Sequence, residues 1–275
     1  MKRKVQSKVT GFPAMDGAGV KLVRVLGHGT VNDFDPILML DSFDSQNPAD
    51  YTAGFPMHPH RGIETVSYVY KGKMKHKDSL GFEDTVEDGE VQWMTAGSGI
   101  LHEEQLPPSD RLLGVQLWLN LPADKKMVNP EYHSIKNNQI QEIPFEGGKI
   151  RLLAGDYKEF KGFQGKYSPL NYYDIELEPN SKIEIETALD DSIMLFTLLS
   201  DVAVEGEHIA EKTAAKLTPG NSVVIESGAK KAKVLFIGSK TLNESISWGG
   251  PIVMNTEAEL RQAFVELRNG TFIKK

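Results

Sequence analysis

The sequence predicts an all-β fold made of two β-rich halves and closed by one C-terminal helix. Short apolar runs separated by Gly, Pro, Asn and Asp recur from Val20 to about Leu121, and again over residues 149 to 239. Runs of about four to eight residues, with turn signals every eight to twelve, are typical of β-sandwiches and barrels. The helical period is clear only at the end of the chain.

Composition narrows the class of protein. The chain has 275 residues, 40% hydrophobic and 25% charged, which is the balance of a soluble globular protein with one large or two ordinary domains. Its net charge of -7 argues against nonspecific binding to nucleic acid, which needs clustered Lys and Arg. Because there is no cysteine, any metal site must use His, Asp, Glu or water.

The amino terminus begins with a basic run but lacks the apolar segment of a signal peptide. No stretch approaches the length of a membrane span. We therefore expect a cytoplasmic protein with no direct nucleic-acid or membrane partner.

The predicted strands of the first half are VKLVRVL, PILMLDSF, ETVSYVYKG, MKHKDSLG, GEVQWMTAG and GVQLWLNL. Residues 122–148 follow, which are polar, contain three prolines and show no sustained period. Such a segment is typical of a connection between domains.

The predicted strands of the second half are KIRLLAG, YYDIELEP, KIEIETA, SIMLFTLL, NSVVIESG and KVLFIGS, several of which alternate strictly. This half resembles a repeat of the first, because residues 86–97 and 217–228 each read as a turn ending in Gly, an apolar strand and another Gly. The second copy has no His-x-His and one histidine, His208. We therefore predict domains at residues 1–130 and 131–275, with polar chemistry only in the first.

The predicted helix lies within the last 20 or so residues. Thr256 and Glu259 form a capping box, and Gly270 stands where a helix stop belongs. Three apolar residues share one face: Leu260, Phe264 and Leu267. We expect a structural closing helix that packs against a β-domain.

Two histidines stand one residue apart in GFPMHPHRGIETVSYV, at the start of a buried strand. Side chains alternate along a strand, so His58 and His60 emerge on one face about 7 Å apart, close enough to share one ion. Pro59 between them indicates an edge, a bulge or the first residues of the strand. Taken alone, the pair fits two metal ligands and two surface histidines equally well.

A second cluster follows in TAGSGILHEEQLPP. By the same parity His102 and Glu104 share a face while Glu103 points away, so Glu104 is the better fourth ligand of an extended segment. Glu64 competes for that role, because it has the same parity as both upstream histidines. Three imidazoles and one carboxylate suit a divalent first-row metal, and the ligand types leave Fe, Mn, Co, Ni, Cu and Zn open.

The sequence also resembles the pirin family of bicupins. The strings that carry the resemblance are NDFDPILMLDSF, HPHRGIETVSYVYKG, HKDSLG, VQWMTAGSGILHEE, GVQLWLNLP and GPIVMNTEAELRQAFVELRNGTF. They span nearly the whole chain and are weakest between residues 122 and 220. The resemblance implies two cupin domains, each a jelly-roll β-barrel, that face each other, with one mononuclear metal in the amino-terminal barrel.

Carried over by position, the ligands of the family fall on His58, His60, His102 and Glu104. The resemblance thus favours Glu104 over Glu64, although His-x-His-x-x-x-Glu is the general cupin spacing. Glu64 then either fixes a ligand imidazole or Arg61, or is a plain structural carboxylate. For Arg61 we favour a structural ion pair with Glu64 over contact with an anionic ligand.

Other residues near these motifs have simpler interpretations. Trp93 and Met94 are expected in the core, whereas Gln116 and Trp118 either line a cavity or cover the second domain. The remaining histidines are interpreted as turn, solvated strand, connector and loop residues, in this order: His28, His76, His133 and His208.

The resemblance implies a quercetin 2,3-dioxygenase activity, in which a metal binds a flavonol and O2 opens its heterocycle. Fe(II) is the ion that we expect, with Ni, Mn, Co, Cu and Zn as alternatives. Glu104 would alternate between ligand and general base. We expect a monomer, because two barrels in one chain can bury the surfaces that single cupins bury by dimerising.

An alternative function is a non-enzymatic one. Pirin-like proteins are also associated with transcriptional regulators and metabolic enzymes, so the metal-bound protein could act as a redox-sensing regulator that binds such a partner. A further alternative is that another small aromatic or sugar-like compound is the substrate, since fold and ligands do not fix the substrate.

Overall fold

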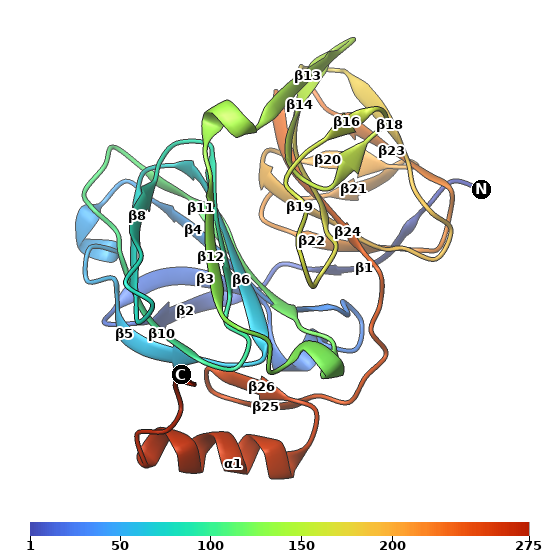
Figure 1. Cartoon of the computed structure of the whole chain (residues 1–275). Helices are drawn as coiled ribbons and strands as arrows, with labels where there is room; N and C mark the ends of the chain where they lie inside the picture. The colour runs from blue at the N-terminus through green and yellow to red at the C-terminus, as the bar shows by residue number, and fades with distance from the viewer. Residues whose placement is uncertain (275) are drawn as a thin grey trace. The chain divides into compact units, whose positions relative to one another are not determined.

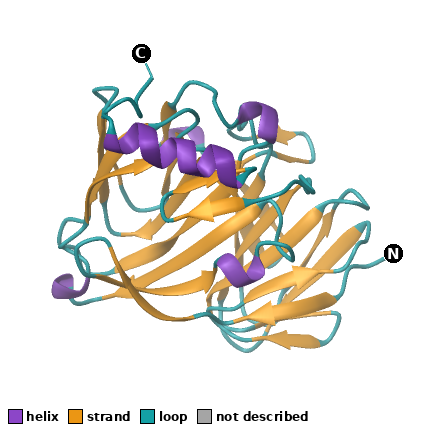
Figure 2. Cartoon of the chain, turned by 90° about the horizontal axis from the view of Figure 1, so that it is seen from below, coloured by secondary structure: helices purple, strands orange, loops and turns teal. Residues whose placement is uncertain are grey.

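The computed structural model of the chain describes residues 1–274. Most of the secondary structure is β-strand. Among the described residues there is one α-helix, α1 (Glu257–Arg268) (Figures 1 and 2). The chain forms two compact units. The N-terminal unit contains Phe12–Gly29, Ile37–Asn137 and the chain from Leu242 onward, and the C-terminal unit contains Met1–Gly11, Thr30–Pro36 and Asn138–Thr241.

The N-terminal unit is built from two main sheets. The seven-stranded sheet has the order β12-β9-β6-β11-β4-β3-β2. Its strands are β2 (Phe12–Asp16), β3 (Val20–Leu26), β4 (Ile37–Ser45), β6 (Ile63–Lys71), β9 (Glu90–Thr95), β11 (Leu112–Asn120) and β12 (Glu131–Ile135). The four-stranded sheet has the order β5-β10-β7-β8, with β5 (Phe55–His60), β7 (Met74–Asp78), β8 (Glu83–Val86) and β10 (Ile100–Gln105).

The C-terminal unit has the same plan. Its seven-stranded sheet has the order β1-β22-β19-β24-β17-β14-β13, and its four-stranded sheet the order β18-β23-β20-β21. The strands are β1 (Val5–Val9), β13 (Gln141–Phe145), β14 (Gly148–Ala154), β17 (Asn171–Leu177), β18 (Lys182–Glu186), β19 (Ser192–Leu199), β20 (Val202–Val204), β21 (Glu207–Ile209), β22 (Ala214–Leu217), β23 (Ser222–Ser227) and β24 (Ala232–Ser239). A small hairpin joins β15 (Asp156–Tyr157) to β16 (Phe160–Lys161).

The matching sheet orders reveal the internal repeat, but with a different alignment from the predicted one. Counting along both units, β9 corresponds to β22, and β10 corresponds to β23. The repeat predicted from the sequence instead aligns residues 86–97, which contain β9 (Glu90–Thr95), with residues 217–228, which contain β23 (Ser222–Ser227). The pattern of Gly, strand and Gly recurs at successive strands, so it cannot fix which strand matches which.

The compact units differ from the predicted ranges 1–130 and 131–275 at both ends of the chain. Strand β1 pairs antiparallel with β22, which places the amino terminus in the C-terminal unit. Strand β12 pairs with β9, and α1 belongs to the N-terminal unit. Pairing between segments so distant in sequence leaves no local periodicity, so the sequence pattern could not reveal it.

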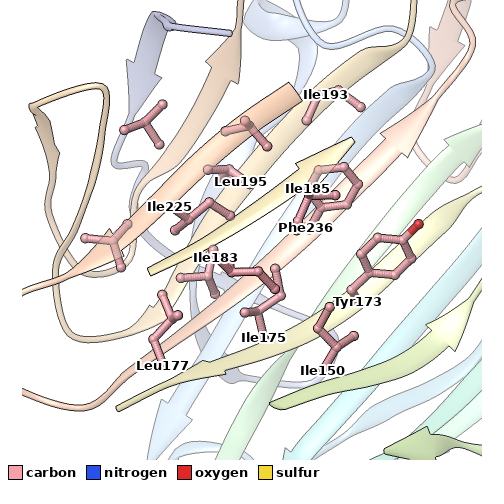
Figure 3. Packing of buried hydrophobic residues seen from close by; sticks show 14 of the residues in the cluster. Ile150, Tyr173, Ile175, Leu177, Ile183, Ile185, Ile193, Leu195, Ile225 and Phe236 are labelled. Carbon is pink, nitrogen blue, oxygen red and sulfur yellow. The ribbon is translucent and has the colours of Figure 1, made fainter. Parts of the chain in front are cut away.

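The C-terminal unit has apolar side chains at the positions that correspond to the histidine cluster of the N-terminal unit. Strands β18 and β23, the counterparts of β5 and β10, bury Ile183, Ile185 and Ile225. Figure 3 shows these side chains packed with Leu195 and Phe236 in one cluster. Alternating burial on β18 follows from its alternating sequence KIEIE. The second barrel therefore keeps the framework and fills it with hydrophobic side chains.

The C-terminal segment packs onto the N-terminal unit through α1, β25 (Ser247–Gly249) and β26 (Ile252–Met254), which lie together in Figure 1. The predicted capping box is confirmed, with Thr256 and Glu259 bonded reciprocally. Gly270 follows the helix with φ +70°, as a helix stop requires. The predicted apolar face packs with Ile252, Met254 and Phe272: it consists of Leu260, Phe264 and Leu267.

Gly62 allows this packing to be close. It has φ +77°, and a Cβ at this position would lie 1.9 Å from Val253 O. Because only glycine tolerates both conditions, the loop after β5 meets β26 backbone to backbone. The glycine of HPHRG thus positions the end of β5 against the C-terminal segment.

Candidate metal centre

Three histidines converge from two paired strands of the four-stranded sheet. His58 and His60 lie on β5, and His102 lies on β10, directly opposite His58 in the antiparallel register. Side chains at opposite positions of such a pair emerge on the same face. One ring nitrogen of each histidine lies within 4.8 Å of the others, so the cluster could hold a metal ion.

Backbone carbonyls fix the tautomers of two of these rings. His58 Nδ1 lies 2.8 Å from Pro56 O, and His60 Nδ1 lies 3.0 Å from Pro251 O. Since a carbonyl only accepts, each Nδ1 carries a proton, and in the neutral form of either ring, which is the form that binds a metal, Nε2 presents a lone pair.

The two Nε2 atoms of His58 and His60 are 3.0 Å apart. When both rings are neutral, two lone pairs face each other at that distance and repel unless a cation lies between them. Metal–nitrogen bonds of about 2.1 Å place two adjacent ligand atoms about 3 Å apart, so the spacing fits a bound ion. His102 Nε2 is also buried and has no hydrogen-bond partner. The three nitrogens therefore have the geometry and the chemistry of a metal site.

Burial keeps the inner rings neutral. It lowers the pKa of His60 to about 3, and the neighbouring His58 adds to this effect. Burial also lowers the pKa of His102 well below its ordinary value, assisted by His60 and His58. Neutral imidazole is the form that binds metals, so His60 and His102 need lose no proton to bind one at neutral pH.

Glu104 is buried on the same face of β10 as His102, whereas Glu103 is partly exposed, as strand parity predicts. Its carboxylate accepts hydrogen bonds from Gln92 Nε2 at 2.5 Å and from Gln116 Nε2 at 3.1 Å. The three-histidine cluster does not include Glu104. The structure thus brings the three histidines together, with Glu104 two residues further along the same strand face.

Gln116 and Trp118 connect this carboxylate to His60. Trp118 Nε1 donates to Gln116 Oε1 at 3.3 Å, and the indole lies edge-on to the His60 ring with centroids 4.9 Å apart. Gln116 and Trp118 therefore lie beside the histidine cluster. The predicted core positions of Trp93 and Met94 are confirmed, since both are buried.

Family models match most of the N-terminal region and the C-terminal third of the chain. The model described as Pirin matches residues 19–119, and the model described as Pirin C-terminal cupin domain matches residues 172–273. The chain belongs to the pirin family. The expected fold class is confirmed: two cupin domains of mostly β-structure, with a C-terminal helix.

Curated relatives of this pirin-family chain carry two kinds of name. A protein of Pseudomonas aeruginosa named putative quercetin 2,3-dioxygenase is 39% identical over 271 residues, covering 95% of each chain. Human pirin is 33% identical over 273 residues, covering 97% of this chain and 93% of that protein.

Solved structures agree with the family. Quercetin 2,3-dioxygenase from Acinetobacter baumannii superimposes with a TM-score of 0.90 at 32% identity, covering 99% of both chains. A bacterial pirin from Escherichia coli, solved in complex with nickel(II), has a TM-score of 0.66 at 20% identity, covers 87% of this chain and 98% of its own, and shows the shared fold.

Arg61, next to the histidines, is a structural residue of this pirin fold. Its guanidinium is 2% exposed, forms a 2.8 Å ion pair with Glu266 and donates to Phe272 O at 2.9 Å. Arg61 is thus held in a structural ion pair, as predicted, but its partner is Glu266 of the C-terminal helix and not the predicted Glu64. Glu64 is fully buried and accepts a hydrogen bond from Thr95 Oγ1 at 2.7 Å.

His76 is the residue that sequence reasoning missed. We predicted a solvated strand residue, which is wrong, because His76 is 0% exposed and its Nδ1 lies 3.4 Å from His102 Nδ1. The available signal was the alternation in MKHKD, where Met74, His76 and Asp78 are buried between more exposed lysines. The same parity that paired the site histidines would have found it.

The other histidines lie on the surface or at its edge. His28 is exposed and stacks on Trp248 with ring centroids 3.8 Å apart. His133 and His208 have exposed side chains beside Glu131 and Asp201. Within residues 1–274, no helix of this pirin-family chain has both the length and the apolar character to cross a membrane.

Proposed function

We propose that this chain is a metal-dependent flavonol dioxygenase of the quercetin 2,3-dioxygenase type. In this proposal His58, His60, His102 and Glu104 hold one divalent ion, with Fe(II) as the working ion. The observation that carries it is the pair of Nε2 atoms 3.0 Å apart beside a third buried Nε2 without a hydrogen-bond partner. The relatives named quercetin 2,3-dioxygenase support the substrate class, a flavonol with O2.

A divalent metal bound there supplies Lewis acidity toward the flavonol oxygens and redox chemistry toward O2. The residues of the chain supply position and proton transfer. Glu104 is the nearby carboxylate that can accept the 3-hydroxyl proton of the flavonol, which makes it the proposed general base. The amide groups of Gln92 and Gln116 orient its oxygens, and Trp118 offers an aromatic surface beside His60.

The function is tested by metal reconstitution. The metal-free protein is loaded separately with Fe(II), Mn, Co, Ni, Cu and Zn, and the loss of quercetin absorbance is followed under oxygen. We expect turnover with at least one ion, and loss of both metal and turnover in His58→Ala and His102→Ala. His133→Ala, at an exposed histidine, is the matched control and should retain both.

Stoichiometric metal without flavonol turnover for any of the six ions would contradict the enzymatic proposal. That result would favour the alternative of a metal-bound regulator that acts through a protein partner. Turnover that survives the loss of His58 and His102 would contradict the proposed site itself.

A further inference from the structure

His76 and Asp78 reach the metal centre from the strand beside His102. Strand β7 pairs antiparallel with β10, so Asp78 stands opposite His102 and His76 stands opposite Glu104. The contact to His102 is made at Nδ1, where His76 Nδ1 lies 3.4 Å away. Both β7 side chains are fully buried.

The orientation of Asp78 and His76 is fixed by several contacts. Asp78 Oδ1 accepts the backbone N–H groups of Leu80 at 2.8 Å and Phe82 at 3.1 Å, which leaves Oδ2 for His76 Nε2 at 2.8 Å. The His76 ring stacks on Tyr132 of β12, with centroids 4.1 Å apart and an interplanar angle of 15°. Neither side chain can turn without losing partners.

With Asp78 ionised and both imidazole rings neutral, these contacts determine which ring nitrogens carry the protons. The Asp78 carboxylate only accepts, so His76 Nε2 carries a proton and His76 Nδ1 presents a lone pair. His102 Nδ1 must then be the donor to His76, which leaves His102 Nε2 with a lone pair. The opposite tautomer would put a buried N–H at His102 Nε2, where no hydrogen-bond partner exists.

We propose that Asp78 and His76 are positioning residues that fix the tautomer of His102 and hold its Nε2 lone pair ready for the metal. The pair does for His102 what Pro56 O does for His58 and Pro251 O does for His60. A carboxylate behind a ligand histidine is a common device for this purpose, but here a second imidazole stands between them. The inference rests on the metal site of the proposed function, not on flavonol turnover.

Asp78→Asn is the sharpest variant, because it is nearly isosteric. The backbone N–H groups of Leu80 and Phe82 keep the amide oxygen of the new residue in the place of Oδ1. Its NH2 group then faces His76 Nε2, which must become an acceptor. The proton of His76 moves to Nδ1, His102 Nδ1 becomes an acceptor, and His102 Nε2 carries the proton that blocks metal binding.

The first measurement needs no variant. Long-range 1H–15N correlation spectra of the metal-free wild-type protein, labelled at histidine, report the tautomer of each ring. We expect protons on His102 Nδ1 and on His76 Nε2. A proton on His102 Nε2 would overturn the proposal, whether or not the protein turns over a flavonol.

The second measurement is Co²⁺ affinity by chelator competition. We expect Asp78→Asn to weaken Co²⁺ binding about 10- to 100-fold and to reverse both tautomers. His76→Phe keeps a ring against Tyr132 but removes the acceptor, so it should weaken binding about tenfold. Variants that fold and bind Co²⁺ as tightly as wild type would overturn the proposal.

The matched control is Asp201→Asn. Asp201 also pairs with a histidine, His208, at 3.0 Å, and its other oxygen also accepts a backbone N–H, but the pair is exposed and belongs to the C-terminal unit. We expect this variant to keep Co²⁺ affinity within about twofold of wild type, as for an exposed pair. A loss equal to that of Asp78→Asn would show a nonspecific effect and overturn the proposal.

Discussion

Arg61 forms a 2.8 Å ion pair with Glu266, and the same guanidinium lies 4.2 Å from the centre of the Phe272 ring. Arg61 follows His60 directly, and His60 itself is oriented by Pro251 O. Two adjacent residues at the end of β5 are therefore held by the C-terminal segment. The C-terminal segment therefore supports the histidine cluster of the N-terminal unit.

Glu266→Gln should destabilise the protein and weaken the metal centre. The substitution leaves the buried Arg61 guanidinium without its counter-charge, and such a loss costs about 3 kcal/mol. We expect a decrease of this order in the free energy of unfolding, measured by denaturant titration, and weaker Co²⁺ binding. Lys274→Gln removes an exposed partner of the same carboxylate and should cost less than about 1 kcal/mol. Equal effects of the two substitutions would contradict the role of Arg61.

Glu104→Gln should separate proton transfer from metal retention. The three histidines remain, so the variant should still bind the metal at saturating concentration, while turnover falls about a hundredfold or more because the base is lost. The new amide also places an NH2 group against the N–H donors of Gln92 or Gln116. Glu103→Gln, on the opposite face of β10, is the control and should keep both properties. Full turnover in Glu104→Gln would remove this carboxylate from the mechanism.

Lys126 should make stability depend on pH above neutrality. Its Nζ donates to Gly62 O at 2.7 Å and to Asn120 Oδ1 at 2.5 Å. Burial lowers the pKa of Lys126 from 10.5 to about 7, although Glu244 and Glu259 oppose the shift. Between these values the unfolded chain binds more protons than the folded one, so stability rises with pH.

The size of that effect can be measured against Lys126→Met. We expect the free energy of unfolding of the wild type to rise by about 2 kcal/mol, relative to Lys126→Met, between about pH 7.5 and pH 9.5. The neighbouring Lys125 is more exposed, so Lys125→Met should show the pH dependence of the wild type. Parallel curves for wild type and Lys126→Met would refute the shifted pKa.

Ile185→Ala should affect stability without affecting the metal. Ile185 is buried in the core of the C-terminal unit, and its removal leaves a cavity that costs about 2–5 kcal/mol. Co²⁺ affinity of the folded variant should equal that of the wild type, because the ligand histidines lie in the N-terminal unit. Weaker Co²⁺ binding by the folded Ile185→Ala variant would show that the second barrel takes part in metal binding.

The sequence could predict features that depend on local periodicity. Strand parity placed His58 and His60 on one face and separated Glu104 from Glu103, and the capping box located the start of the helix. These features follow from the geometry of single elements, which the chain encodes within a few residues.

Features that depend on long-range pairing could not be predicted. Strand β1 pairs with β22 far along the chain, and Arg61 finds its carboxylate 205 residues away at Glu266. His76 is a different case, because its parity was visible and only its neighbour was unknown. A buried histidine next to exposed lysines becomes informative once the register of β7 and β10 is known.

The most direct test of the account is a crystal structure of the metal-loaded protein with anomalous scattering recorded at the absorption edge of the ion. We predict one ion per chain, bound by Nε2 of His58, His60 and His102 and by the carboxylate of Glu104. An ion bound elsewhere, or bound through Nδ1 of His102, would contradict the proposed centre.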